Sequence, residues 1–152
     1  MMIARQMIPV FALTFIAGCG HAPMNRMPPD IGDKAAEYAV AMVGTPYRYG
    51  GESPSSGFDC SGLVNYSYAR AGVRVARTTG ALRRESYAIS PRELRRGDLL
   101  FFDQEGKKSS HVAVYIGANR FVHAPSSGKV VHVTNFSGYW RRHLSDARRL
   151  EY

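Results

Sequence analysis

The order of the hydrophobic patterns along the chain limits the fold more than any other feature of the sequence. Apolar residues recur at helical spacing from Asp33 to Val43, and a second helix is expected from Cys60 to Ala71, with Gly72 as its stop. After Gly97 the pattern changes to short apolar runs separated by turns, which is typical of strands. Helices followed by strands predict an α+β domain with a mostly antiparallel sheet.

The expected strands are short, and about five to six of them fit the sequence. Four are clear from their apolar residues: Asp98–Phe102, His111–Gly117, Arg120–Ala124 and Val130–Thr134. The other segments are expected to be an aromatic and glycine-rich loop at 45–51, a surface loop at 52–58, a polar helix near 80–86, a turn or short helical step at 91–97 and a final short helix or edge strand within 139–149. A chain of 152 residues with 45% hydrophobic content suits one domain with a core.

The N-terminus is typical of an export signal. After Arg5 an apolar stretch runs from Met7 to Ala17, much shorter than the roughly 20 residues that a membrane-spanning helix needs. The following residues complete the sequence Ile-Ala-Gly-Cys at 16–19, which resembles a bacterial lipobox and implies lipid attachment, including palmitate, at Cys19. An ordinary secretory signal with an incidental cysteine is the alternative.

These features predict three parts of the chain. Residues 1–18 are expected to be a lipoprotein signal peptide, residues 19–31 a lipidated tether, and residues 32–152 the catalytic domain. More than one acyl chain is needed for stable anchoring, and a triacylated cysteine meets that requirement. Because Gly20 follows the cysteine, resemblance to lipoprotein sorting rules favours the outer membrane, with the domain facing the periplasm.

Cys60 is a candidate nucleophile because it lies at the expected start of a helix. The helix dipole and the free backbone N–H groups at this position favour a thiolate, and the N–H of Cys60 can help to form an oxyanion hole. A buried structural cysteine is the alternative reading. Export to an oxidising compartment without a disulfide partner weakens that alternative.

Two histidines lie where a base for this thiol is expected. His111 begins one strand and His123 ends the next, so pairing through the turn at 117–119 would bring both imidazoles to one end of the sheet. One imidazole can then accept the thiol proton while the other holds the first in the required tautomer. His132 and His143 are expected at the surface.

Five segments together resemble the NlpC/P60 family. They are Tyr47–Gly51, Phe58–Val64, Gly97–Phe102, His111–Gly117 and Phe121–Ala124. The closest likeness is to small lipoprotein peptidoglycan endopeptidases of Gram-negative bacteria. One departure concerns the groove rim, where relatives often have a proline before Arg77 and a glutamine a few residues later, and this chain has Ala76 and Leu82.

The resemblance implies a papain-like α+β fold and hydrolysis of stem-peptide bonds that involve D-amino acids or diaminopimelate. It implies that Cys60 is the nucleophile, His111 the general base and His123 the orienting third member. Tyr47 matches a tyrosine that positions the nucleophile or polarises the carbonyl. Asp59 and Ser61 match positions where some members bind the free amine of a stem peptide.

The formal net charge of +8 favours polyanionic partners but is also compatible with plain solubility. The basic residues come as scattered pairs, so we expect peptidoglycan and a membrane as partners, no nucleic acid, and a monomer. We expect no cofactor and no metal, because metal-binding Cys and His pairs are missing. An inactive wall-binding scaffold and an amidase or acyltransferase on the same fold remain open alternatives.

Overall fold

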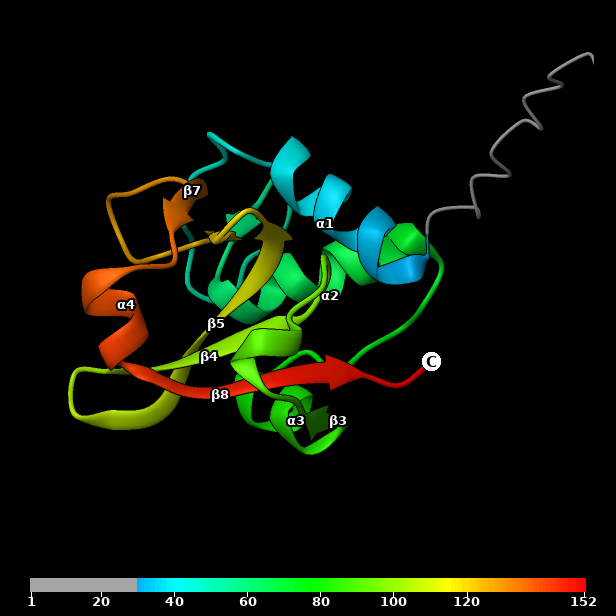
Figure 1. The fold of residues 1–152 in the computed structure, drawn as a ribbon. Coiled ribbons are helices and arrows are strands. Elements are labelled where there is room, and N and C mark those ends of the chain that lie inside the picture. Colours follow the sequence, from blue (N-terminus) through cyan, green and yellow to red (C-terminus); the bar gives the residue numbers. More distant parts are fainter. Residues whose placement is uncertain (1–29) are drawn as a thin grey trace, which may run out of the picture.

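An antiparallel sheet organises residues 30–152, which are the residues that the computed structural model describes (Figure 1). Its six strands lie in the order β3-β8-β4-β5-β6-β7. They are β3 (Ser86–Ala88), β4 (Leu99–Gln104), β5 (Lys107–Gly117), β6 (Arg120–His123), β7 (His132–Asn135) and β8 (Leu144–Leu150). The expected α+β class and mostly antiparallel sheet are confirmed.

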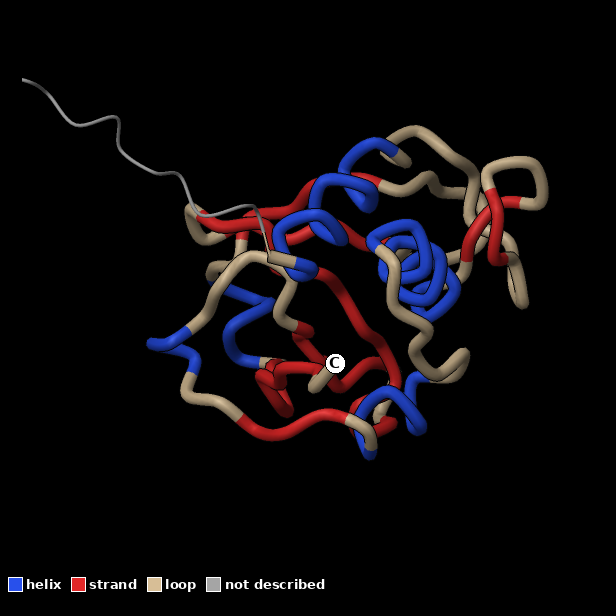
Figure 2. Tube along the Cα trace, turned by 90° about the vertical axis from the view of Figure 1, so that its right-hand side faces the viewer, coloured by secondary structure: helices blue, strands red, loops and turns tan. Residues whose placement is uncertain are grey.

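The helices frame this sheet, and a two-stranded hairpin lies apart from it. The helices are α1 (Ile31–Ala41), α2 (Cys60–Ala71), α3 (Thr79–Arg84), α4 (Gly138–Arg142) and a 3₁₀ turn at Pro91–Glu93. The hairpin pairs β1 (Glu52–Ser53) with β2 (Gly57–Phe58). The longest helices lie side by side next to the strands in the tube view (Figure 2). No helix among residues 30–152 has the length and apolar character to cross a membrane.

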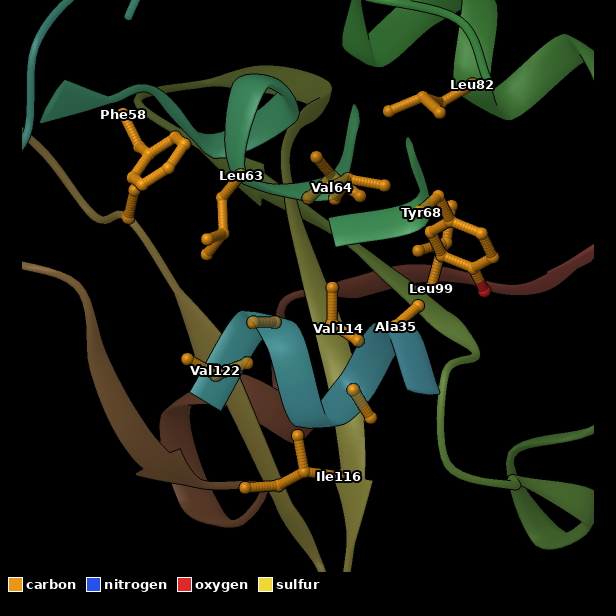
Figure 3. Close-up of a cluster of buried hydrophobic side chains, with 14 of the residues drawn as sticks. Ala35, Phe58, Leu63, Val64, Tyr68, Leu82, Leu99, Val114, Ile116 and Val122 are labelled. Carbon is orange, nitrogen blue, oxygen red and sulfur yellow. The ribbon is translucent and has the colours of Figure 1, made fainter. Parts of the chain in front are cut away.

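One hydrophobic cluster joins α1 and α2 to the sheet. Figure 3 shows Leu63 and Val64 of α2 and Ala35 of α1 gathered around the strand residues Val114 and Val122. All five side chains are buried. Small alanines on α1 let this helix approach the sheet closely, and the apolar area that is removed from water stabilises the fold.

A second cluster covers the opposite face of the sheet. Leu100 and Phe102 of β4, Phe121 of β6 and Phe136 are fully buried here, and Trp140 of α4 packs against them. The Trp140 ring lies edge-on to the Phe102 ring, with 4.8 Å between the ring centroids. Because side chains alternate between the two faces of a strand, β4, β5 and β6 contribute to both clusters.

The bounds of α2 coincide with the prediction from sequence. Gly72 ends the helix in the left-handed conformation, with φ at 104°, and its N–H bonds to the carbonyl of Ala69. Leu63, Val64 and Ser67 point inward, as expected.

Other predictions need correction. The helix α1 begins at Ile31 and ends at Ala41, and Val40 and Val43 are exposed because the buried stripe is formed by the alanines. The segment 52–58 is a hairpin instead of a surface loop, and its last residue, Phe58, is fully buried.

The C-terminal strand also differs from the prediction. We expected a final helix or an edge strand, whereas α4 is followed by β8 inside the sheet, between β3 and β4. The strand β3 was not expected from sequence. A buried ion pair holds this region together, since Arg149 Nε donates to Asp98 Oδ1 at 2.7 Å and Arg149 Nη2 donates to Oδ2 at 2.8 Å.

Candidate active site

Cys60 is the first residue of α2 and is partly exposed. The preceding Asp59 is in extended conformation and caps the helix, accepting a 2.7 Å hydrogen bond from the N–H of Gly62. The thiol therefore lies at the positive end of the helix dipole. Its Sγ is 3.7 Å from the hydroxyl of Thr79, the first residue of α3.

The Asp59 carboxylate joins three separate segments at this point. Besides capping α2, it accepts a 2.9 Å hydrogen bond from the N–H of Gly50 in the preceding loop. The guanidinium of Arg77 binds both of its oxygens at 3.0 Å, and also donates to Ser61 Oγ at 3.1 Å. Bidentate pairs of this kind are among the strongest hydrogen bonds in proteins. Asp59 thereby fixes the start of α2, and with it the backbone position of Cys60.

Gly62 lets the loop pass very close to the helix. A Cβ at this position would lie 2.0 Å from the carbonyl oxygen of Gly51, a contact that no side chain can make. Any larger residue at position 62 must therefore displace either the loop or the N-terminal turn of α2.

His111 and His123 are joined by a buried hydrogen bond. The Nε2 of His111 lies 2.8 Å from the Nδ1 of His123, and the Nε2 of His123 lies 3.0 Å from the Thr134 hydroxyl. Both histidines are almost completely buried. The chain of contacts therefore runs from the His111 ring through His123 to the edge strand β7.

Only one direction of this hydrogen-bond chain leaves His111 able to accept a proton at Nδ1. If His123 Nε2 donates to Thr134, then His123 Nδ1 accepts from His111 Nε2, and His111 Nδ1 carries a free lone pair. If Thr134 donates instead, the His111 proton lies on Nδ1 and blocks it. The hydroxyl of Thr134 is thus the group whose direction sets the tautomer of His111.

Burial keeps both imidazoles neutral. Desolvation lowers the pKa of His111 from 6.5 to about 4. Desolvation, followed by the charges of His111, His132 and Lys129, lowers the pKa of His123 to about 2. The Trp140 ring contributes to this burial, with its centroid 5.0 Å from that of His123. A neutral imidazole is the form that can take a proton from a thiol.

Two clefts meet at Cys60. One has a volume of about 340 Å³ and is lined by His111 together with the β4–β5 turn and the segment 125–127. The other has a volume of about 510 Å³ and is lined by residues of the Asp59 network and by Thr79. Cys60, Tyr47 and Ser110 line both of them. The thiol therefore lies where the two clefts adjoin.

Tyr47 is the phenol beside the thiol in both clefts. Burial raises its pKa above 10, and the neighbouring Cys60 and Asp59 raise it further. The hydroxyl therefore keeps its proton near neutral pH and can donate a hydrogen bond to an oxygen atom in the groove.

The structure brings most of the predicted site residues into one place. Cys60, Tyr47 and His111 line one cleft, His123 contacts His111, and Asp59 and Ser61 line the other cleft with Cys60. Cys19 lies outside the described residues, as do the predicted signal peptide and all but the last two residues of the tether. Among residues 30–152 no group of three or more His, Cys, Asp or Glu side chains could hold a metal ion.

The other two histidines in the described region lie near the site or at the surface. His132 is half-buried beside His123, with 4.7 Å between the ring centroids, so it contacts the histidine pair. His143 is half-buried as well and stacks on Tyr139 at 3.9 Å between centroids.

Sequence reasoning missed Thr134, the role of Arg77, and Trp140. No local pattern marks Thr134, because its contact with His123 depends on the pairing of β6 with β7. Arg77 was noticed only as part of a rim motif. Arg77 and Asp59 are 18 residues apart, and no helix or strand periodicity predicts an ion pair at that spacing.

Comparison with known proteins gives concordant results. The model of the NlpC/P60 family matches residues 44–149. Murein DD-endopeptidase MepH of Escherichia coli K12 is 42% identical over 116 residues, which are 73% of this chain and 43% of that protein. Bifunctional muramidase/DL-endopeptidase CwlT of Bacillus subtilis 168 is 39% identical over 80% of this chain and 37% of its own length. The chain thus spans less than half the length of these two relatives.

The solved structures agree with the fold. An NLP/P60 family protein of Staphylococcus aureus Mu50, described as similar to lipoprotein, superimposes with a TM-score of 0.71 and 33% identity, over 86% of this chain and 45% of that one. This likeness agrees with the papain-like α+β fold that the sequence indicated.

The depressed histidine pKa values predict how stability depends on pH. The unfolded chain binds protons on these histidines below pH 6.5, whereas the folded protein resists protonation down to about pH 4 at His111. The contribution of the histidines to the free energy of unfolding should therefore be fully present above pH 6.5. As the pH drops, the free energy of unfolding should fall by about 2 kcal/mol per histidine between pH 7 and pH 4.5.

Urea unfolding of wild type and His123→Gln at both pH values tests this. Carboxylates titrate in both proteins. The difference between wild type and variant in the stability lost on acidification therefore reports the contribution of the histidines. The variant should lose about 2 kcal/mol less than wild type on acidification. Equal losses would contradict a neutral buried pair.

Proposed function

Because the chain belongs to the NlpC/P60 family, we propose that it is a cysteine endopeptidase that hydrolyses peptide bonds in the stem peptides or crosslinks of peptidoglycan. The observation that carries the proposal is the pairing of Cys60, at a helix N-terminus, with a neutral buried histidine in the same cleft. The names of the relatives, a murein DD-endopeptidase and a DL-endopeptidase among them, support the choice of substrate.

The first half of the reaction uses Cys60 and His111. In our proposal Nδ1 of His111 accepts the thiol proton as Sγ attacks the carbonyl carbon of the scissile bond. The negative charge that develops on the carbonyl oxygen is stabilised by the N–H of Cys60 and the hydroxyl of Tyr47. The C–N bond then breaks, and His111 gives its proton to the leaving amine, which leaves a thioester on Cys60.

The second half restores the enzyme. Water attacks the thioester carbonyl while His111 accepts one of its protons, and the C–S bond breaks. The imidazolium then returns the proton to the thiolate, and the new carboxylate is released. Throughout both halves His123 holds the ring of His111 by the 2.8 Å hydrogen bond and acts as an orienting group without contacting the substrate.

Asp59 and Ser61 are assigned to substrate binding in this proposal. They line the cleft of about 510 Å³ beside Cys60, where the amine end of a stem peptide would lie. Arg77 pairs with both Asp59 and Glu52, so one guanidinium faces two carboxylates and the cluster keeps a formal negative charge that would attract a protonated amine.

Cys60→Ala tests the reaction. We expect the wild-type chain without residues 1–19 to release muropeptides from purified sacculi and the alanine variant to lose at least about a thousandfold in rate, because the nucleophile is removed. Mass spectrometry of the products identifies the bond that is cut, and new carboxyl and amine ends separate an endopeptidase from an amidase. Similar release by both proteins would disprove the mechanism.

Thr134→Val tests the orienting chain. The substitution keeps the shape but removes the acceptor for His123 Nε2, so kcat should fall about tenfold, the equivalent of one hydrogen bond. The acid limb of the pH profile should shift as well. Thr134→Ser restores the hydroxyl and should keep kcat within about threefold of wild type. Loss of activity in both variants alike would point to packing instead of tautomer control.

We also propose that the chain is exported and anchored in the outer membrane, facing the periplasm, through lipid on Cys19. The Ile-Ala-Gly-Cys sequence at residues 16–19 supports this. Expressed with labelled palmitate, the full chain should carry the label and fractionate with outer membranes. Cys19→Ser should carry none and appear in the soluble fraction. Label that persists in the serine variant would refute attachment at this residue.

A further inference from the structure

A basic cleft of about 470 Å³ continues the catalytic groove. It is lined by Gly80, Arg83 and Arg84 of α3 and by Lys108 and Ser109 of β5. We propose that this cleft binds a free carboxylate of the peptide substrate and so selects stem peptides that carry one. The inference rests on the proposed function and names a substrate feature that this function leaves open.

The position of the cleft connects it to the reacting thiol. Thr79 and Ser110 line the cleft beside Cys60, and the adjacent residues Gly80 and Ser109 line the basic cleft. Residues that are neighbours in the sequence, along α3 and along β5, therefore line the two clefts. In this proposal the carboxylate of the substrate enters the basic cleft while the scissile bond lies at Cys60.

Two of the three cations have no anionic partner in the described part of the chain. Arg83 is paired with Asp146, with 2.5 Å between Nη2 and Oδ2. Arg84 and Lys108 make no ion pair within residues 30–152. The basic cleft thus keeps two positive charges that are available to a ligand.

The guanidinium of Arg84 lies over Gly80. A Cβ built on Gly80 would lie 3.5 Å from Arg84 Nη1, so the guanidinium lies close to Gly80, which follows Thr79 in the chain. The charge of Arg84 therefore lies at the part of α3 that borders the cleft beside Cys60.

The nearby carboxylates lie outside the basic cleft. Asp146 binds Arg83, and Asp103 accepts a 2.7 Å hydrogen bond from the N–H of Ser109. Glu85 follows Arg84 at the end of α3 and is exposed. None of these three residues lines the basic cleft, so an anion that enters it meets only cationic and neutral side chains.

A carboxylate is the anion that fits this arrangement and this substrate. Guanidinium groups bind carboxylates with two parallel hydrogen bonds, and an ammonium group nearby adds a point charge. Stem peptides offer such groups, since diaminopimelate has a carboxylate outside the peptide chain and every stem whose end is not crosslinked terminates in one.

Paired synthetic stem peptides test the proposal. The two peptides have the same sequence, and one has its free carboxylates converted to amides. Wild type should cleave the carboxylate form with kcat/KM about tenfold higher, mainly through KM, as expected for a charged contact that is partly exposed to solvent. Arg84→Gln/Lys108→Gln should lose this preference and cleave the amidated form as well as wild type does.

A matched variant controls for net charge. Arg92→Gln/Arg95→Gln also removes two positive charges, but from the region around the 3₁₀ turn, in a separate cleft. This control should keep the preference for the carboxylate form.

The outcomes separate the two proposals. Equal cleavage of both peptides by wild type would overturn the carboxylate site and leave the proposed function intact. Loss of preference in the control variant would also overturn the site, because the effect would then follow from overall charge. Cleavage of neither peptide by wild type, with intact sacculi equally resistant, would overturn the proposed function itself.

Discussion

The Asp59 carboxylate is the contact on which the geometry of the groove depends. It holds the loop at Gly50, the first turn of α2 and the Arg77 side chain at one point, and all three line or support the space beside Cys60. A carboxylate bound by two N–H groups and a guanidinium has no freedom to move. The backbone therefore positions Cys60, whose sulfur also contacts the hydroxyl of Thr79.

The histidine pair depends on a different physical effect, which is exclusion of water. The second hydrophobic cluster, and above all Trp140, surrounds His111 and His123 and keeps them neutral. The aromatic rings that stabilise one face of the sheet therefore also help to lower the pKa values of the two histidines at its end. Packing and protonation cannot be changed independently here, because any loss of burial raises the pKa values of His111 and His123 as well as lowering stability.

Local signals allowed much of this to be predicted from sequence. An aspartate before Cys60 and a glycine after Ala71 delimit α2, and the alternation in β5 and β6 places both histidines on one face. The contacts that were missed all join distant segments. Thr134 meets His123 only through strand pairing, Arg77 meets Asp59 across a loop, and β3 exists only because β8 pairs with it. No spacing rule encodes such contacts, since they depend on the assembled sheet.

The place of β8 inside the sheet has a consequence for the order of folding. Residues 144–150 fill the gap between β3 and β4, so the sheet cannot close until almost the last residue of the described chain is available. Contacts between segments so far apart form late and slowly. The α4 helix, which carries Trp140 to the histidines, is held between β7 and this strand. A chain in which residues 144–150 have not yet paired would therefore carry the thiol and both histidines without the ordered α4 helix that helps to enclose the histidines.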